Sequence, residues 1–426
     1  MDSLDDAIGY VLDGCDPLAP VPVAPAAALG LVLAGDVVAA EAVPPFANTA
    51  MDGYAVRAVD TGGAAPGSPV RLPVVAEVAA GHPAERPLGP GEAMRIFTGA
   101  PIPDGADAVV MVERTRRADD EDGSQAVQID LEVVPGNHLR AAGEDMKPGE
   151  RVFGAGDEVT PARMGVMAAL GVGEVLAHPR PRVGVISTGD ELVTGPQSLR
   201  PGQIRDSNRP TLLALVARAG GQPVDLGHVP DDEVAIEAAI ERGATSCDAV
   251  LSSGGVSMGD IDLVRVVLDR IGDMRWMQVA IRPAKPLAFG RVPGPAGRPV
   301  PVFGLPGNPV SSMVSFALFA RPGLRRLAGH PDDRLHLPRW GAVAAEPLPR
   351  RPDGKTHFVR VTVELDGSGA LRVRSSGGQG SHQLGSMARA GGLAVLPDGA
   401  GVAAGETVPV ILLAEPATAP VPPATA

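Results

Sequence analysis

The pattern of apolar and polar positions changes near residue 181. From there to about residue 325, short apolar runs alternate with segments of helical periodicity. The predicted strands are 183–186, 224–229, 249–251 and 301–305, and the predicted helices are 211–218, 232–242, 262–271 and 309–320. Strands that alternate with helices indicate a parallel sheet covered on both faces. We therefore predict an α/β domain over residues 179–328.

The regions on either side of the α/β domain have a different pattern of apolar and polar residues. Short alternating runs separated by turn residues predict β-rich domains over residues 46–137 and 334–414. Residues 4–14 and 26–39 are expected to be helices, and residues 147–170 a strand followed by a Met-rich helix. We group segments 1–45 and 138–178 as one N-terminal helical linker domain. The last residues, 415–426, are rich in Pro, Ala and Thr, and we expect them to be disordered. The fold class is thus multidomain α/β plus β.

Composition and charge narrow the class of protein. A chain of 426 residues with 44% hydrophobic and 20% charged residues is typical of soluble globular proteins with several domains. The net charge of −13 argues against a nucleic-acid-coating surface. The two cysteines, Cys15 and Cys247, are too few and too far apart for a disulfide framework or a thiolate metal site.

The longest apolar stretch does not favour a membrane span. It covers residues 23–40, and Pro25, Gly30 and Gly35 interrupt it, so a buried helix is the better interpretation. The N-terminus is acidic and lacks the basic start of a signal peptide. We expect a cytoplasmic protein without membrane or nucleic-acid partners.

Three strands of the α/β domain end in turns with ligand-binding chemistry. The turns are Ser187-Thr188-Gly189, Ser252-Ser253-Gly254-Gly255 and Pro306-Gly307-Asn308-Pro309. Parallel strands would bring them to one sheet edge, where α/β folds bind ligands. Glycines expose backbone N–H groups to anions, and a following helix N-terminus adds a favourable dipole. Each turn alone is explained by strand termination, but three in one domain favour a phosphate site.

Charged residues near these turns extend the prediction. Asp231 follows the second strand and Asp262 opens the helix after the Gly-Gly turn, so together they suit a divalent cation such as Mg²⁺. The alternative is that these carboxylates cap helices. In Arg282-Pro283-Ala284-Lys285-Pro286, prolines stiffen a segment that holds two cations, which suits an oxyanion or phosphate.

Eight motifs together carry a resemblance to a known family. They are NTAMDGYAV, FTGAPIPDGADAVV, RAAGED, ISTGDEL, GQIRDSN, SSGGVSMGD, LPGNPVSS and SHQLGSM, in this order. The chain resembles the molybdopterin molybdenumtransferases, which comprise the bacterial MoeA proteins and the E domains of gephyrin and of its plant counterpart. The resemblance runs from about residue 5 to 413.

The resemblance implies an elongated four-domain homodimer whose α/β domain has the molybdopterin-binding fold. The implied reaction inserts molybdate into adenylylated molybdopterin with a divalent cation, Mg²⁺, and releases AMP and molybdenum cofactor. The adenylyltransferase of the preceding step and molybdoenzyme apoproteins are candidate partners. The active cleft would combine the α/β domain of one subunit with the β domain of its partner.

The resemblance also implies roles for individual residues. Asp52, Thr98, Asp145 and Glu191 would be catalytic, and Asp231 and Asp262 would hold the metal. Cofactor-binding residues would be Arg140, Ser187, Thr188, Gly189, Ser252, Ser253, Gly254, Gly255, Arg282, Lys285, Pro306, Gly307, Asn308, Pro309, Arg360 and Ser381. Arg360 and Ser381 match positions implicated in oxyanion handling. The chain departs from the usual Lys-Pro-Gly-Lys-Pro at Arg282 and Ala284, and Gln278 stands where a basic residue is common.

Three alternatives remain open at this stage. An adenylyltransferase of the same fold is typically a lone α/β domain, whereas this chain adds domains on both sides. A gephyrin-like receptor scaffold would need a peptide groove, and the lack of a fused adenylyltransferase domain favours a plain bacterial-style enzyme. Tungstate could replace molybdate, because the two oxyanions have nearly the same size and charge. The sequence does not identify the recipient molybdoenzyme or the exact ligands of the cation.

Overall fold

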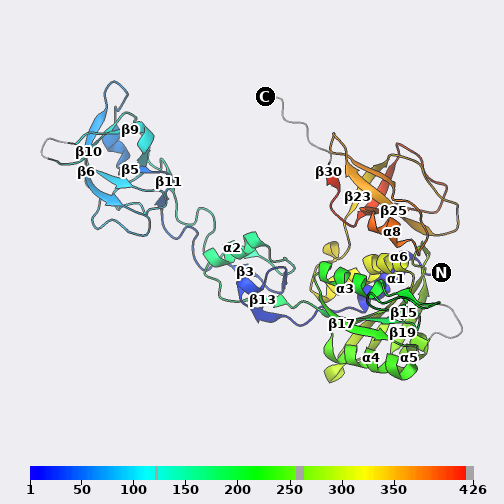
Figure 1. Ribbon diagram of the computed structural model, residues 1–426. Helices are drawn as coiled ribbons and strands as arrows, with labels where there is room; N and C mark the ends of the chain where they lie inside the picture. Colours follow the sequence, from blue (N-terminus) through cyan, green and yellow to red (C-terminus); the bar gives the residue numbers. More distant parts are fainter. Residues whose placement is uncertain (120–122, 256–262, 419–426) are drawn as a thin grey trace.

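The computed structural model describes residues 1–119, 123–255 and 263–418. Figure 1 shows an elongated molecule with a β domain at one end, a small domain in the middle, and the α/β and C-terminal domains side by side at the other end. The chain runs out to the β domain and returns through the middle domain before it enters the α/β domain.

The α/β domain has a six-stranded sheet in the order β17-β14-β18-β22-β21-β19. Its strands are β14 (Arg182–Thr188), β17 (Gln222–Val229), β18 (Ala249–Ser253), β19 (Asp273–Gln278), β21 (Pro286–Pro293) and β22 (Pro299–Leu305). The first four strands of the order are parallel, as the sequence predicts. β21 and β19 are antiparallel additions, so the sheet is mixed.

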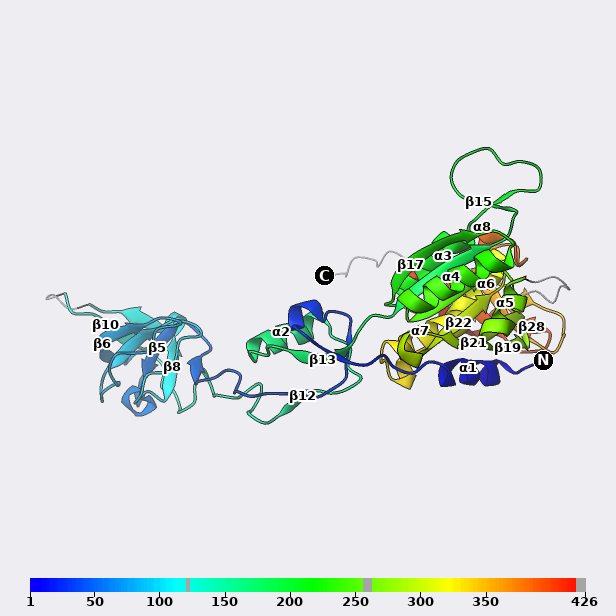
Figure 2. The same cartoon turned by 90° about the horizontal axis from the view of Figure 1, so that it is seen from below.

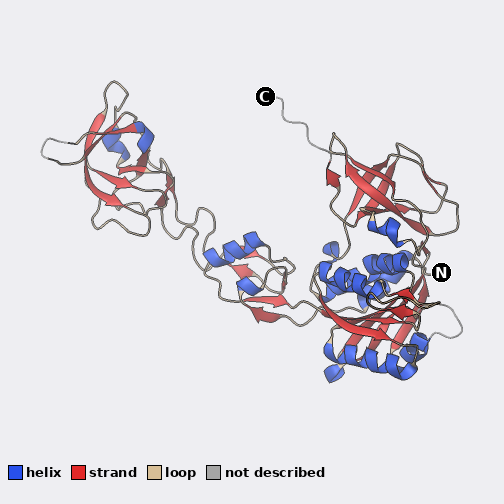
Figure 3. Cartoon of the chain, in the orientation of Figure 1, coloured by secondary structure: helices blue, strands red, loops and turns tan. Residues whose placement is uncertain are grey.

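Helices cover both faces of this sheet (Figure 3). α4 (Glu233–Ser246) and α5 (Leu263–Ile271) share one apolar cluster with Val250 of β18. α3 (Asn208–Arg218) and α6 (Pro309–Ser315) share the opposite cluster with Leu251, the next residue of the same strand. Successive side chains of a strand point to opposite faces, so a continuous apolar run serves both layers.

The expected helix at 309–320 is longer than the sequence suggests. A π-helical turn, Phe316–Ala320, joins α6 to α7 (Arg321–Leu327). Pro322 has no N–H to continue an α-helical ladder, and the wider turn lets Arg321 N–H bond to the carbonyl of Phe316. The Pro-Gly pair therefore does not end the helix.

The N-terminal helix α1 (Leu4–Asp13) packs on the α/β domain (Figure 2). Its buried Ala7 and Val11 belong to the cluster that contains Phe289 and Phe319. Gly14 caps its C-terminus, as expected. α1 therefore belongs to the α/β domain in space, although the sequence predicts that residues 1–45 form part of the linker domain.

The middle domain corrects one prediction. Residues 26–39 do not form a helix: after a 3₁₀ turn, Pro25–Ala27, they form β2 (Val32–Leu33) and β3 (Val37–Val38). Gly30 adopts a φ of +74°, which breaks the helical path, and the valines pair with strands of the returning chain. The remaining elements are β1 (Val21–Val23), β12 (Arg151–Phe153), α2 (Pro161–Ala169) and β13 (Val175–His178).

The two β-rich domains are present as predicted. The distal one has strands β5 (Gly53–Val56), β6 (Val70–Val78), β7 (Ala93–Ile96), β8 (Ala108–Met111), β9 (Thr115–Arg117) and β10 (Ala126–Ile129), with β4 (Asn48–Thr49) and β11 (Leu139–Arg140) at its base. The C-terminal one has β23 (Arg339–Ala344), β24 (Leu348–Pro349), β25 (Thr356–Leu365), β26 (Leu371–Ser375), α8 (Leu384–Ala388), β27 (Gly392–Leu396), β28 (Gly401–Val402) and β29 (Thr407–Leu412).

Two further features concern the chain ends and the membrane. Within the tail that was expected to be disordered, β30 (Ala417–Thr418) pairs with β25, while residues 419–426 lie outside the described part. Among the described residues, no helix has the length and apolarity needed to cross a bilayer.

Candidate active site

The three strand-end turns of the α/β domain lie at one edge of the sheet. In the parallel register, Ser187 stands opposite Ser253, and Ser253 stands opposite Leu305. The N–H of Gly254 donates to the carbonyl of Leu305 over 3.1 Å, so the second and third turns are in direct contact. The predicted convergence of these turns is therefore present in the structure.

The backbone of the second turn requires glycine. Gly254 has a φ of +99° and Gly255 a φ of +73°, a region that side chains rarely adopt. A Cβ on Gly254 would also lie 3.1 Å from Thr188 Oγ1 of the neighbouring turn. The two glycines thus allow the backbone to fold closely over the edge where an anion would bind.

A segment at the start of α3, for which the sequence predicts no role, connects the turns. Ser187 Oγ donates to Asp206 Oδ2 over 2.6 Å. Asn208 Nδ2 donates to Ser253 Oγ over 2.8 Å and to the carbonyl of Gly307 over 2.7 Å. The GQIRDSN motif contained both residues, but nothing in their spacing along the chain indicates these partners.

Arg209 anchors the same segment. Its guanidinium is nearly buried and bonds to Asp206 and, through two bonds of 2.6 Å, to Asp225 of β17. Desolvation raises the pKa of Asp206, but hydrogen bonds from Ser187 and Arg209 outweigh it and hold that pKa below its usual value. Asp206 is thus an anionic acceptor at neutral pH.

Of the two predicted metal ligands, the structure describes only Asp231. Asp231 N–H donates to Asp190 Oδ1 over 3.1 Å, and Asp190 N–H approaches Asp231 Oδ2 at 3.3 Å. Asp232, not Asp231, caps α4 by accepting from Ala235 N–H over 2.9 Å. Asp262 lies outside the described residues. Within the described ranges, no three Asp, Glu, His or Cys side chains form a group that could hold a metal ion.

The Arg282–Lys285 segment joins the α/β and C-terminal domains. Arg282 belongs to β20 (Ile281–Arg282), which pairs with β25 so that Arg282 stands opposite His357. Ala284 has a φ of +73°, a conformation that favours glycine, and Lys285 is exposed. The motif position at which the family usually has glycine therefore keeps the backbone conformation of glycine.

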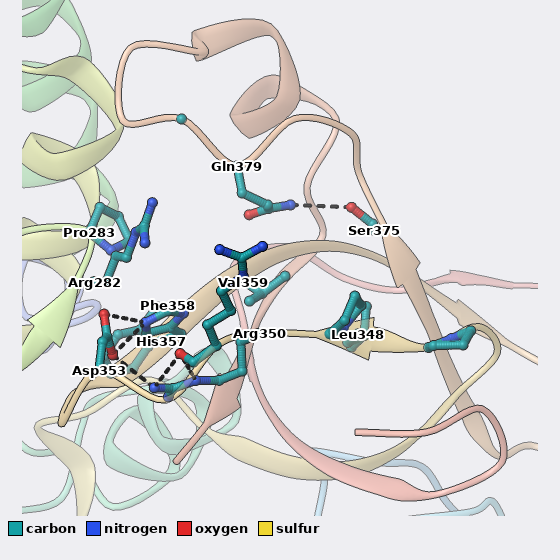
Figure 4. Close-up of a pocket in the computed structure, with 14 residues that line it drawn as sticks. Arg282, Pro283, Leu348, Arg350, Asp353, His357, Phe358, Val359, Ser375 and Gln379 are labelled. Carbon is teal, nitrogen blue, oxygen red and sulfur yellow. Dashed lines mark hydrogen bonds and ion pairs between the residues drawn. The ribbon is translucent and has the colours of Figure 1, made fainter. Parts of the chain in front are cut away.

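A cavity of about 600 Å³ lies between this segment and the C-terminal domain (Figure 4). Arg282 and Pro283 stand on one side of it, and Gln379 on another. Its lining residues are Arg282, Pro283, Pro347, Leu348, Pro349, Arg350, Arg351, Asp353, His357, Phe358, Val359, Ser375, Gln379 and Gly380. Desolvation raises the pKa of Asp353, but hydrogen bonds from His357 and Lys355 outweigh it and lower that pKa to about 2.

The two predicted oxyanion residues of the C-terminal domain lie beside this cavity. Arg360 is fully buried and donates to Ser386 Oγ and to the carbonyls of Gly378 and Gly380, while its Nη1 has no partner among the described residues. The carbonyl of Ser381 accepts from Val310 N–H at the start of α6. Arg360 therefore supports the loop that brings Ser381 to the Pro306–Pro309 turn.

The distal β domain holds the other half of the predicted site. Thr98 donates to Asp52 Oδ1 through its backbone N–H and its Oγ1, both over 2.7 Å. These two bonds lower the pKa of the exposed Asp52 carboxyl. Arg140 pairs with Asn48 in the short β4–β11 ladder, and Asp145 follows in an exposed turn.

Arg95 stands beside Asp52 and was not singled out by the sequence. Its guanidinium lies over the rings of Tyr54 and Phe97, 5.0 and 5.3 Å from their centres. Its charge contributes to the lowered pKa of Asp52. Arg95 belongs to β7 and Phe97 follows its last residue, so the alternation of side chains in an extended chain places both on one face. This alternation can be seen in the sequence.

Within one chain, the two groups of predicted residues do not meet. The Asp52 and Thr98 pair belongs to the β domain, whereas the strand-end turns belong to the α/β domain at the far end of the molecule (Figure 1). Glu191 is exposed after β14, and its carboxylate lies over Gly189. Within a single chain, the predicted site residues therefore fall into two separate groups.

Comparison with known proteins agrees with this architecture. Residues 2–171 match the MoeA N-terminal region (domain I and II), residues 184–326 a probable molybdopterin binding domain, and residues 342–413 the MoeA C-terminal region (domain IV). Molybdopterin molybdenumtransferase 2 of Mycobacterium tuberculosis is 43% identical over 385 residues, which cover 89% of this chain and 91% of that protein. The chain belongs to the molybdopterin molybdenumtransferase family.

Other relatives are similar over the same length. The molybdopterin molybdenumtransferase of Haemophilus influenzae is 36% identical over 89% of this chain and 90% of its own. A crystal structure of the molybdopterin biosynthesis MoeA protein of Pyrococcus horikoshii OT3 aligns with a TM-score of 0.79 at 30% identity, covering 97% of this chain and 100% of that one. These findings confirm the predicted family, its fold and its transferase activity in molybdenum cofactor biosynthesis.

Proposed function

We propose that this molybdopterin molybdenumtransferase joins molybdate to adenylylated molybdopterin and releases AMP in a cleft shared by two copies of the chain. The observation that carries the shared cleft is the separation of the two half-sites within one chain. In a two-fold dimer, the β domain of each copy can reach the α/β domain of the other, so both clefts become complete together.

The strand-end turns would bind the phosphates of the substrate. The Gly254 N–H bonds to the carbonyl of Leu305 and holds this turn against the Pro306–Pro309 turn, and both glycines have a positive φ. Backbone turns of this kind can form anion-binding concavities. Lys285 and Arg282 are both exposed to solvent, and they add positive charge near the turns. Backbone hydrogen bonds hold the turns before substrate arrives, which lowers the cost of ordering them on binding.

Two described carboxylates support the proposed cation site. Asp190 and Asp231 face each other, both are exposed, and neither forms an ion pair within the described ranges. Oxygen ligands of this kind suit Mg²⁺, and we propose that Asp231 and Asp262 hold it with help from Asp190. A bound cation would neutralise charge on the phosphate linkage that breaks.

The oxyanion would enter through the cavity beside Arg282. This cavity opens next to Gln379 and Gly380, and Ser381 follows at the N-terminus of α6. Attack of water on the adenylyl phosphorus would break the phosphoanhydride bond, release AMP and leave the other phosphate on molybdopterin, so no nucleophilic side chain is required. Asp52, Thr98, Asp145 and Arg140 of the partner subunit would position the substrate from the opposite wall.

The direct test is AMP release from adenylylated molybdopterin by the purified protein. We expect release that requires both molybdate and Mg²⁺, and formation of molybdenum cofactor that activates an apo-molybdoenzyme. Equal release without molybdate would identify a phosphodiesterase instead. Pyrophosphate production from ATP and molybdopterin would favour the adenylyltransferase reaction, and parallel assays with tungstate measure oxyanion preference.

A further inference from the structure

The hydroxyl groups at the strand ends differ in where their hydrogens point. Ser187 Oγ donates to the carboxylate of Asp206 over 2.6 Å, so its hydrogen is already used. Ser252 Oγ lies 3.4 Å from the carbonyl of Gly254. Ser253 Oγ instead accepts a hydrogen bond from Asn208 Nδ2 over 2.8 Å, and the described residues supply no acceptor for its own hydrogen.

We infer that Asn208 is a positioning residue, which orients the Ser253 hydroxyl as the hydrogen-bond donor to the phosphate of the bound nucleotide. A hydroxyl has one hydrogen and two lone pairs. Because Asn208 occupies a lone pair of Ser253 Oγ, the hydrogen turns away from Asn208. Gly254 follows Ser253 directly and lies next to Gly307, at the edge where the anion would lie.

A second hydrogen bond strengthens the assignment. The other hydrogen of Asn208 Nδ2 bonds to the carbonyl of Gly307 over 2.7 Å. One amide group therefore sets both the Ser253 turn and the Pro306–Pro309 turn, and it can do so only as a double donor. Asn208 is the first residue of α3, whose position is held by the Arg209 ion pairs with Asp206 and Asp225.

This inference rests on the proposed function, because AMP is the product that carries the phosphate. The experiment is calorimetric titration of the full chain with AMP and Mg²⁺, using Ser253→Ala, Asn208→Leu and the double variant. A hydrogen bond to a charged group predicts about a tenfold or larger loss of affinity for Ser253→Ala. Asn208→Leu has a similar volume, cannot donate and adds no charge, so it should lose a similar factor.

The double variant decides whether Asn208 acts through Ser253. We expect it to bind AMP no more weakly than the weaker single variant, because both substitutions remove the same contact. Two losses that multiply would overturn the inference. Ser253→Thr keeps the hydroxyl and should restore affinity to within about threefold of the unmodified chain. Asn208→Ala is the second variant should Asn208→Leu fail to fold.

Thr211→Val is the matched control on α3. Thr211 Oγ1 bonds to the carbonyl of Ser207 one turn away from the site, so its removal tests for a general effect on the helix. It should leave AMP affinity unchanged. In turnover, Asn208→Leu should raise the KM for adenylylated molybdopterin more than it lowers kcat. If the unmodified chain neither binds AMP nor releases it from the substrate, the proposed function itself is refuted. If the unmodified chain turns over but the losses of the two variants multiply, only the role of Asn208 is refuted.

Discussion

Two hydrogen bonds from Thr98 stabilise the charged form of the Asp52 carboxylate. Both the backbone and the side chain of Thr98 donate to Asp52 Oδ1, and both favour the charged form. The pKa of Asp52 is therefore below the ordinary value of about 3.9, so the group stays charged from neutral pH down into the acid range. Any stabilisation from this depressed pKa is present above the unfolded pKa and is lost as the pH falls through the folded one.

Thr98→Val should raise the pKa of Asp52 towards its ordinary value. The variant keeps the backbone bond and the shape of the side chain but removes the hydroxyl donor, so the shift should be partial. A carboxyl titration followed by NMR measures it. Thr61→Val is the control within the same domain, because the Thr61 hydroxyl bonds to Ala58 and Val133 rather than to a carboxylate. An unchanged titration of Asp52 in Thr98→Val would contradict the assigned cause.

Ala284 carries a second prediction at the residue scale. A non-glycine residue at a φ of +73° costs about 1–2 kcal/mol, and Ala284→Gly removes this cost. The gain offsets the lost burial of a methyl group and the greater freedom of glycine in the unfolded chain. The free energy of unfolding should stay within about 1 kcal/mol of the unmodified chain.

The comparison is Ala239→Gly, in the middle of α4. Ala239 is also buried but has no strain to relieve, so this variant should lose about 1–2 kcal/mol. Denaturant unfolding of both variants provides the measurement. Equal losses at the two positions would show that the backbone at Ala284 is not strained.

At the scale of elements, two adjacent carboxylates at the start of α4 have different hydrogen-bond partners. Asp232 caps the helix, whereas Asp231 faces Asp190 across the sheet edge. Asp232→Ala should therefore lose about 1 kcal/mol of stability, because the cap is gone. Asp231→Asn should keep the stability and lose activity at limiting Mg²⁺, with recovery at high Mg²⁺. Thermal unfolding and AMP release at several Mg²⁺ concentrations distinguish the two roles, and unaltered Mg²⁺ dependence in Asp231→Asn would exclude it as a ligand.

At the scale of the whole molecule, the two half-sites predict complementation. Asp52→Ala and Glu191→Ala chains should each be inactive, and an equimolar mixture should regain about one quarter of full activity. Half of the random dimers are mixed, and one of the two clefts in each mixed dimer contains both intact residues. AMP release after co-refolding is the measurement.

The control pairs two variants of the same half-site. Mixing Glu191→Ala with Asp231→Ala leaves one substitution in the α/β domain of every cleft, so no activity should return. Recovery in this control, or none in the first mixture, would contradict a cleft shared between subunits.

The sequence by itself determined the family, the order of the domains and the strand ends of the α/β site. Those features depend on local signals: apolar runs, glycines that must take a positive φ, and motifs in a set order. The same local reasoning was wrong for residues 26–39, because a chain with helix-like spacing formed strands once partners from residues 151–178 were available. Pairing with distant strands overrode local propensity.

Only the tertiary structure decided which polar groups meet. Asn208 is 45 residues from Ser253 and 99 from Gly307, and no periodicity relates them. The same is true of Asp190 and Asp231, and of Arg360 and the loop that carries Ser381. Hydrogen bonds require donor and acceptor within about 3 Å, a condition that the order of strands in the sheet sets and the linear sequence does not.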